Sequence, residues 1–442
     1  MAGGNSSVVD GALLVYHRPI APWLKDASTV MEHVGAFAAR SRHRIWEVNT
    51  DAGFPEGLDG LDFRAVIVHY CVFGMGPYRL DDRWLEWLDR SRAYKIAFFQ
   101  DECTRCQRRF RFLDEHRFDC VFTCLEPSEF GKAYGRYTRV PKLVSNIPGY
   151  VPAHLPEVGR RFTVPDERRT VDFGYRGRPL PAYLGHGAME KHEIGVRFGE
   201  HAAGRGLALD LETGEADRLY GDDWYRFMAS CRSVLGVESG VSCFDLEDEV
   251  FTEFTERERA GLPVGLSDLA TLPRWEDVVY YRTISPRHFE AAALGVCQVL
   301  YEGRYSGILE PMVHYVPLKK DLSNFDEALG LARDPEVRRE LTTNAHRDLI
   351  ASGEWSYARL IGQVDAVLEE AGLDGRPAPA AEAAAEQRIN QGLARRRRRR
   401  MAHWALFWVL TRRRVQRAIH FAHPFTSRVR RLLGIPGPDG LV

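Results

Sequence analysis

Residues 282–318, RTISPRHFEAAALGVCQVLYEGRYSGILEPMVHYVPL, contain the pattern that decides the fold. Ser285 and Pro286 predict the start of a short helix, because serine caps helices and proline fits the first helical position. Gly295 predicts the end of that helix. The residues after it, Val296–Tyr301, are apolar except for one glutamine, which is typical of a strand covered on both faces. We therefore expect a helix followed by a buried strand, with a second strand at the end of the stretch.

The predicted helix carries two charged side chains that point to a nucleotide-sugar site. Arg287 and Glu290 lie one turn apart in an otherwise apolar helix. A helix start and a cation suit a diphosphate, and a carboxylate suits the hydroxyls of ribose or of a sugar. The pattern therefore favours a donor pocket for a nucleotide diphosphate sugar.

Residues 287–295, RHFEAAALG, resemble the donor-site helix of GT-B glycosyltransferases. The similarity is greatest to the "glycosyl transferases group 1" set related to spore-maturation-protein-like enzymes, which carry Arg-x-x-Glu-Ala followed by a small residue and glycine. It extends over Val171–Ala371 and is looser in the N-terminal half. The resemblance implies an α/β protein with two Rossmann-like, doubly wound domains facing a cleft. It also implies transfer of a sugar from a nucleotide diphosphate sugar.

One position departs from this family pattern. Retaining members carry two glutamates eight residues apart, and the residue eight positions before Glu290 is Arg282. Glu238, which follows another expected strand, is an alternative donor contact. The sequence therefore leaves open whether the reaction retains or inverts the anomeric configuration.

The composition is that of a soluble globular protein with a basic C-terminal segment. The 442 residues are 45% hydrophobic and 27% charged, with a net charge of −1. The segment from Arg388 onward carries a net charge of +13, and the rest of the chain carries −14. The start lacks the pattern of a signal peptide, and eight scattered cysteines suggest reduced thiols in the cytoplasm. A lone CxxC at Cys103 and Cys106 favours neither a metal site nor a redox pair.

The N-terminal half, residues 1–150, shows apolar runs that alternate with helical patterns, as in a parallel doubly wound sheet. Polar residues follow these runs, and ligands of such sheets bind outside the carboxyl ends of the strands. Among those residues, His17, His69 and Asp101 are candidates for the base that takes the proton of an acceptor hydroxyl. Each is also a plausible strand cap. The expected strands are Ala12–Tyr16, Arg44–Val48, Ala65–Val68, Lys95–Phe99 and Asp119–Phe122.

A linker at residues 151–169 is expected to join this acceptor domain to a donor domain at residues 170–372. In the donor domain, Arg178 and Lys191 follow the first expected strand, and two cations can neutralise a departing diphosphate without a metal. The glycine-bearing loop at Ser306 and Gly307 offers backbone amides for the sugar or the diphosphate. Residues 242–276 form an acidic excursion in which Asp245–Asp248 is interpreted as a solvated helix start rather than a metal-binding motif.

The C-terminal segment consists of a linker at residues 373–394 and a basic amphipathic tail at residues 395–442. Six arginines, Arg395–Arg400, precede the apolar run MAHWALFWVL. Ten apolar residues are too few to span a bilayer, but tryptophans and arginines suit an anionic membrane surface. We expect residues 395–431 to bind such a surface in preference to nucleic acid.

The sequence as a whole predicts a cytoplasmic glycosyltransferase, peripheral on the inner face of the cell membrane. It would act on a glycan or lipid-linked acceptor in the synthesis of cell-surface polysaccharide or glycoconjugate, with no cofactor and no metal. Two alternatives remain open at this point: a sugar-nucleotide epimerase or hydrolase, and a non-catalytic nucleotide-binding scaffold.

Overall fold

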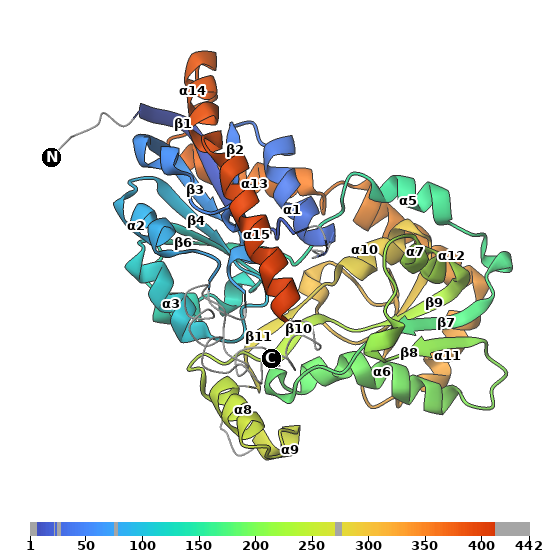
Figure 1. Ribbon diagram of the computed structural model, residues 1–442. Coiled ribbons are helices and arrows are strands. Elements are labelled where there is room, and N and C mark those ends of the chain that lie inside the picture. The colour runs from blue at the N-terminus through green and yellow to red at the C-terminus, as the bar shows by residue number, and fades with distance from the viewer. Residues whose placement is uncertain (1–6, 22, 24–27, 75–77, 270–275, 412–442) are drawn as a thin grey trace. The chain divides into compact units, whose positions relative to one another are not determined.

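The computed structural model describes residues 7–21, 23, 28–74, 78–269 and 276–411 (Figure 1). The chain divides into two compact units. One contains residues 1–31, 43–93 and 372–442, and the other contains residues 32–42 and 94–371. The predicted domain bounds at residues 150, 170 and 372 remain predictions.

The first unit is built on three parallel strands in the order β2-β1-β3. From β1 the chain first adds β2 on one side of the sheet and then adds β3 on the other side. The order in which strands are added therefore reverses at β1. Leu14, at the centre, pairs with Glu47 and Ile67. The described elements are β1 (Ser7–Tyr16), β2 (Ile45–Asn49), η1 (Thr50–Ala52), η2 (Glu56–Gly60), β3 (Leu61–Val68), η3 (Tyr70–Val72), α2 (Asp82–Arg90), α14 (Pro379–Asn390) and α15 (Leu393–Thr411).

The second unit begins with three parallel strands in the order β4-β5-β6. β4 and β5 are mostly buried, as the alternating pattern predicts, whereas β6 is half-buried, and a helix lies in each connection. The expected linker at residues 151–169 contains a helix, because α5 occupies residues 155–162. The elements are most of α1 (Ser28–Arg40), then β4 (Tyr94–Phe98), α3 (Cys106–Glu115), β5 (Cys120–Thr123), α4 (Tyr134–Tyr137), β6 (Lys142–Ser145) and α5 (Leu155–Phe162).

The same unit contains a five-stranded parallel sheet in the order β13-β12-β9-β7-β8. Strand β8 is added on one side of β7 and strand β9 on the other, so the order in which strands are added reverses between β7 and β9. This is the doubly wound arrangement. Neighbouring residues of β9 enter different core clusters: Val234 packs with α7 and α10, whereas Leu235 packs with α6 and α11. Helices therefore cover both faces of the sheet (Figure 1). The elements are β7 (Val171–Arg176), α6 (His186–Ala202), β8 (Leu209–Glu212), α7 (Asp222–Ser230), β9 (Cys231–Gly236), α10 (Pro286–Ala293), β12 (Cys297–Tyr301), η8 (Tyr305–Gly307), β13 (Val316–Leu318), α11 (Phe325–Arg333), α12 (Pro335–Ala345), η9 (His346–Ala351) and α13 (Tyr357–Glu370).

An antiparallel hairpin is added to this sheet architecture. Its strands β10 (Ser239–Cys243) and β11 (Glu276–Thr283) pair Gly240 with Arg282. The acidic excursion between them contains α8 (Glu249–Arg259) and α9 (Leu266–Leu269). The excursion is thus an inserted helical segment between two strands of a hairpin.

The predicted α/β class with parallel, doubly wound sheets is confirmed. The deciding stretch folds as expected, since α10 begins at Pro286 and every residue of β12 is buried. Gly295 ends the helix in the left-handed region with a φ of 60°. The expected C-terminal linker is helical: its apolar and alanine-rich residues form α14 and the start of α15.

Residues 412–442 of the predicted tail lie outside the described residues. Across the part of the chain that is described, no helix has both the length and the apolar character needed to cross a bilayer.

Candidate functional site

The candidate site lies outside the carboxyl ends of β7 and β9, where open α/β sheets bind ligands. A turn connects β7 to Gly185, and α6 then begins at His186. The N–H of Gly187 donates to Ser242 Oγ at 2.7 Å, which attaches the start of α6 to the hairpin strand β10. A long helix therefore begins at the chain reversal of the sheet, in the position that suits an anionic ligand.

Lys191 is the centre of the charged groups at this edge. Its half-buried Nζ donates to the carbonyl oxygen of Gly240 at 2.9 Å. Burial lowers the pKa of Lys191, the carboxylate of Asp101 acts in the opposite direction, and the positive charges of Arg287 and Arg178 lower it further. The charges of Asp101, Arg287 and Arg178 therefore all lie close enough to Lys191 to influence its pKa.

Arg287 and Glu290 are joined through an aromatic side chain of α7. The guanidinium of Arg287 lies over the ring of Trp224, 5.2 Å from its centroid, and donates to the carbonyl oxygen of Arg176. Trp224 Nε1 donates to Glu290 Oε2 at 2.8 Å. Burial raises the pKa of the Glu290 carboxyl to about 7 even though this hydrogen bond opposes the shift. Glu290 therefore exchanges its proton near neutral pH.

Glu238 holds a loop in the structure. Its carboxylate accepts hydrogen bonds from the backbone N–H of Arg304 at 3.0 Å and of Tyr305 at 2.8 Å. The hydroxyl of Tyr280 donates to the same carboxylate at 2.8 Å. The side chain is buried, and burial raises its pKa. Its predicted contact with the donor sugar remains a prediction, and these bonds assign it a structural role.

The loop that Glu238 holds contains Ser306 and Gly307. Tyr305, Ser306 and Gly307 all have positive φ values, 47°, 56° and 69°. Two consecutive non-glycine residues in this region indicate local backbone strain of the kind that accumulates at functional sites. Ser306 Oγ lies 2.6 Å from Thr283 Oγ1, and Gly307 is exposed. The strained loop follows β12 at the carboxyl edge of the sheet.

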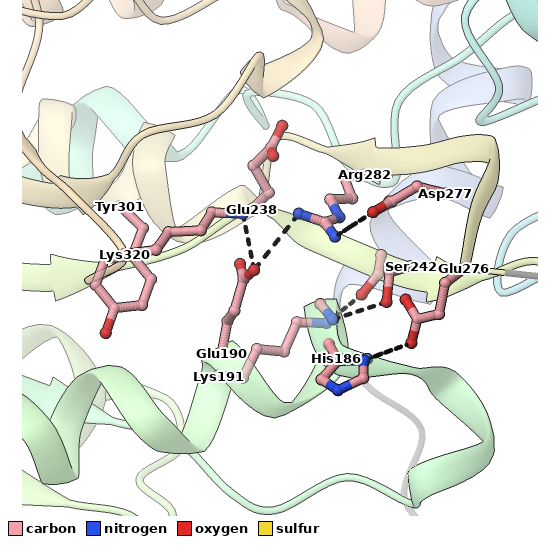
Figure 2. Close-up of polar contacts among 12 residues, drawn as sticks. His186, Glu190, Lys191, Glu238, Ser242, Glu276, Asp277, Arg282, Tyr301 and Lys320 are labelled. Carbon is pink, nitrogen blue, oxygen red and sulfur yellow. Dashed lines mark hydrogen bonds and ion pairs between the residues drawn. The ribbon is translucent and has the colours of Figure 1, made fainter. Parts of the chain in front are cut away.

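Figure 2 shows a charged cluster that sequence reasoning missed. Glu190 of α6 accepts from Lys320 Nζ at 2.7 Å and from Arg282 Nη1 at 3.4 Å. Arg282 also pairs with Asp277 at 3.1 Å, and its side chain is 11% exposed. The arginine that departs from the family pattern is therefore neutralised by two acids. Lys320 follows β13, so the rule that selected residues at strand ends would also have found it.

Asp101 has a backbone conformation that is uncommon for a non-glycine residue, with a φ of 54°. The adjacent Glu102 is fully buried, and its carboxylate accepts from Thr123 Oγ1 at 2.8 Å and from the N–H of Cys124 at 2.7 Å. This anchor fixes the backbone beside Asp101. Desolvation raises the pKa of Asp101, and the charge of Lys191 opposes the shift.

The other two candidate bases, His17 and His69, belong to the first unit and are buried. His17 Nδ1 lies 3.0 Å from Thr50 Oγ1, and Nε2 lies 2.9 Å from Arg79 Nη1. Burial, together with the charge of Arg79, lowers the pKa of His17 to about 4. His69 Nδ1 accepts from the N–H of Cys71 at 3.2 Å and caps η3. Both rings therefore serve local structure, and their predicted catalytic roles remain predictions.

The acidic segment Asp245–Asp248 corrects one interpretation of the sequence. Asp245 is fully buried rather than solvated, and its carboxylate accepts from the N–H groups of Glu249 and Phe251 in the first turn of α8. Asp248 accepts from the N–H of Cys106 at 2.6 Å and thereby caps α3. These carboxylates accept hydrogen bonds from backbone N–H groups at helix starts that have no partner within the helix. The bonds take the place of hydrogen bonds to water, so the carboxylates can be buried.

The cysteines and acids do not form a metal centre in the described residues. No disulfide is found there, and no group of three or more His, Cys, Asp or Glu side chains is arranged to hold a metal ion. Burial raises the pKa of the Cys106 thiol well above its ordinary value.

No protein-family model matches the chain, and no curated protein matches it in sequence. The solved structures to which it is similar include an alpha-glucosyltransferase in complex with UDP, with a TM-score of 0.44 and 11% identity over 81% of this chain and 99% of that chain. Anabaena HepE in complex with UDP and glucose gives a TM-score of 0.43 and 10% identity over 81% and 99%. TarM gives a TM-score of 0.38 and 12% identity over 69% and 54%. These low identities and TM-scores describe a general similarity in the arrangement of the backbone.

Proposed function

We propose that this chain is a GT-B glycosyltransferase that transfers a sugar from a nucleotide diphosphate sugar to an acceptor hydroxyl. The observation that carries the proposal is the convergence of Arg178, Lys191 and Arg287 at the start of α6. Burial lowers the pKa of Lys191, and the positive charges of Arg287 and Arg178 lower it further, so both guanidinium groups act on this ammonium group. Three cations at a helix start, outside the reversal point of a parallel sheet, match the charge of a departing diphosphate.

In the proposed reaction, the bond between the anomeric carbon of the sugar and the diphosphate oxygen breaks. A bond from the acceptor oxygen to that carbon forms, and the hydroxyl proton leaves to a base. Asp101 is the favoured base, because it lies within electrostatic range of Lys191 and its raised pKa improves proton acceptance. The three cations stabilise the negative charge that develops on the leaving diphosphate, without a metal or a cofactor.

Glu290 is proposed to orient the ribose of the donor. Its carboxylate is half-buried beside Arg287, and the Trp224 indole N–H fixes one of its oxygens. The other oxygen is then available to accept from sugar hydroxyls. The strained loop at Ser306 and Gly307 would supply backbone amides to the transferred sugar or the diphosphate.

We further propose that the acceptor is a glycan or a lipid-linked glycan used for cell-surface polysaccharide or glycoconjugate synthesis. The enzyme would be cytoplasmic and bind the inner face of the cell membrane through its basic C-terminal segment. The arginine-rich α15 supports this location.

The proposal is tested with the purified chain and a panel of nucleotide diphosphate sugars. Binding of one donor should raise the melting temperature, and release of the nucleotide diphosphate should depend on an acceptor glycan. Lys191→Met should weaken donor binding at least tenfold, whereas Lys142→Met, which removes a lysine from β6, should bind as the wild type does.

Two outcomes would replace the proposal with another function. Consumption of the donor at the same rate with and without acceptor would identify a hydrolase or epimerase. Donor binding without any release of the nucleotide would identify a non-catalytic scaffold. Equal donor affinity of Lys191→Met and the wild type would refute the assignment of the site.

A further inference from the structure

Helix α15 is fixed to the first unit through a buried carboxylate. Asp51 follows β2 and has a side chain with no exposed surface. Arg400 Nε donates to its Oδ1 at 2.7 Å, and Trp404 Nε1 donates to its Oδ2 at 2.9 Å. Although burial raises the pKa of Asp51, hydrogen bonds from Ile20, Trp404 and Arg400 outweigh it and hold the pKa below its usual value. The acid is therefore a charged anchor for the helix.

The anchor gives α15 two different faces. The inner face repeats at positions four, seven and eleven residues after Arg396, and its residues are half-buried. They are Arg396, Arg400, His403 and Phe407. The outer face follows the same spacing one residue earlier and is exposed: Arg395, Arg399, Ala402 and Leu406, with Arg398 and Ala405 beside them. The exposed face thus changes along the helix from cationic to apolar.

An exposed aromatic pair continues the apolar end of this face. Trp23, from the segment after β1, and Trp408 of α15 have ring centroids 6.2 Å apart. Each is 42% exposed, and Leu406 is 40% exposed. Trp23 lies far from the basic tail in sequence, so its position beside Trp408 is an observation independent of the arginine run.

We infer that the outer face of α15 and the Trp23–Trp408 pair together form a preformed binding surface for a bilayer containing anionic phospholipid. The charge and the apolar end both fit this partner. Guanidinium groups attract anionic headgroups, and tryptophan rings settle at headgroup depth. A nucleic acid would match the arginines but not the adjoining leucine and tryptophans. The inference deepens the membrane location proposed above and is independent of the sugar chemistry.

The surface is tested by sedimentation of the full-length chain with vesicles, in the absence of any nucleotide sugar. The anionic vesicles contain phosphatidylcholine and about 30% phosphatidylglycerol, and the neutral vesicles contain phosphatidylcholine alone. Changing Arg395, Arg398 and Arg399 together to Gln should weaken binding to the anionic vesicles about 100-fold, at ~1 kcal/mol for each arginine. The matched control changes three exposed arginines of the other unit to Gln: Arg333, Arg339 and Arg359.

Two single variants test the aromatic pair and the carboxylate that anchors α15. Trp23→Ala should weaken vesicle binding about tenfold, whereas Tyr220→Ala, which removes another exposed aromatic ring, should not. Asp51→Asn should increase amide hydrogen exchange in residues 393–408, because the anchor of α15 is weakened.

Three results would overturn the inference. The first is unchanged vesicle binding by the triple arginine variant with a native melting temperature. The second is unchanged binding by Trp23→Ala. The third is tighter binding of a 20-base-pair DNA duplex than of the anionic vesicles by the wild type. Donor binding measured by thermal shift on the same variants separates loss of the membrane surface from failure of the proposed enzyme activity.

Discussion

Replacement of Glu290 by Gln should change the way in which stability depends on pH. Burial raises the pKa of this carboxyl from 4.5 to about 7. Below pH 4.5 the group is protonated in both the folded and the unfolded chain. Between pH 4.5 and 7 the unfolded chain loses its proton first, so the free energy of unfolding of the wild type falls as the pH rises. Above pH 7 the carboxyl is ionised in both states, and the free energy of unfolding falls no further on its account.

The shift sets the size of the effect. A difference of one pKa unit corresponds to about 1.4 kcal/mol, so the full shift corresponds to about 3 kcal/mol. Glu290 retains some exposed surface, and solvent reduces this figure to about 1–3 kcal/mol. In the Glu290→Gln variant the amide side chain has no charge to desolvate and can still accept from Trp224. The variant should therefore match the wild type at pH 4.5 and exceed its stability at pH 8.

The assay is urea denaturation of both proteins at half-unit steps from pH 4.5 to 8.5, followed by tryptophan fluorescence. The measured quantity is the difference in free energy of unfolding between the variant and the wild type. A difference that stays constant over this range would show that Glu290 keeps an ordinary pKa in the folded chain. In parallel, donor affinity of the wild type should rise as the pH passes 7, because the ionised carboxylate accepts from ribose hydroxyls, and the variant should show no such rise.

Three further changes test other parts of the site. Asp101→Asn should lower kcat about 10²–10⁴-fold in a nucleotide-release assay while donor affinity is kept, and a kcat within threefold of the wild type would exclude Asp101 as the base. Glu190→Gln leaves Arg282 and Lys320 without their shared carboxylate, and urea denaturation should show a loss of about 1–3 kcal/mol; an unchanged midpoint would contradict this. Asp248→Ala should cost about 1 kcal/mol and increase hydrogen exchange in the first turn of α3, whereas unchanged exchange there would show that the cap is unimportant.

The sequence predicted most strands because burial on both faces leaves a strong local signal. The expected strand Val296–Tyr301 differs from β12 by a single residue at its start. The short strand β6, whose residues are all half-buried, lacked that signal and was not among the expected strands. The helix α14 was also missed, because its alanine, proline and glutamate composition is shared by linkers and exposed helices.

Site residues were predictable where they follow a strand and carry a charge suited to the ligand. Arg178 and Lys191 were chosen because they follow an expected strand, and Arg287 because it lies in the expected helix. Both arginines act on the pKa of Lys191, and the roles of all three remain predictions. The partners that orient them were not predicted. Trp224 precedes β9 and meets Glu290 only because α7 and α10 pack on the same face of the sheet. Such long-range pairs leave no pattern in a single sequence.

The backbone beside Asp101 is held from the hairpin side as well as from its own sheet. The N–H of Asp245 donates to the carbonyl oxygen of Cys103 at 2.8 Å, and Tyr281 Oη accepts from the N–H of Glu102 at 3.3 Å. Together with the Asp248 cap, these bonds tie residues 102–106 to the β10–β11 insertion. Chimeras that replace the loop after β4 with the loop of another protein would therefore have to transplant the insertion with it. The two segments are therefore one structural unit, although 142 positions of sequence separate Cys106 from the aspartate whose carboxylate caps its helix.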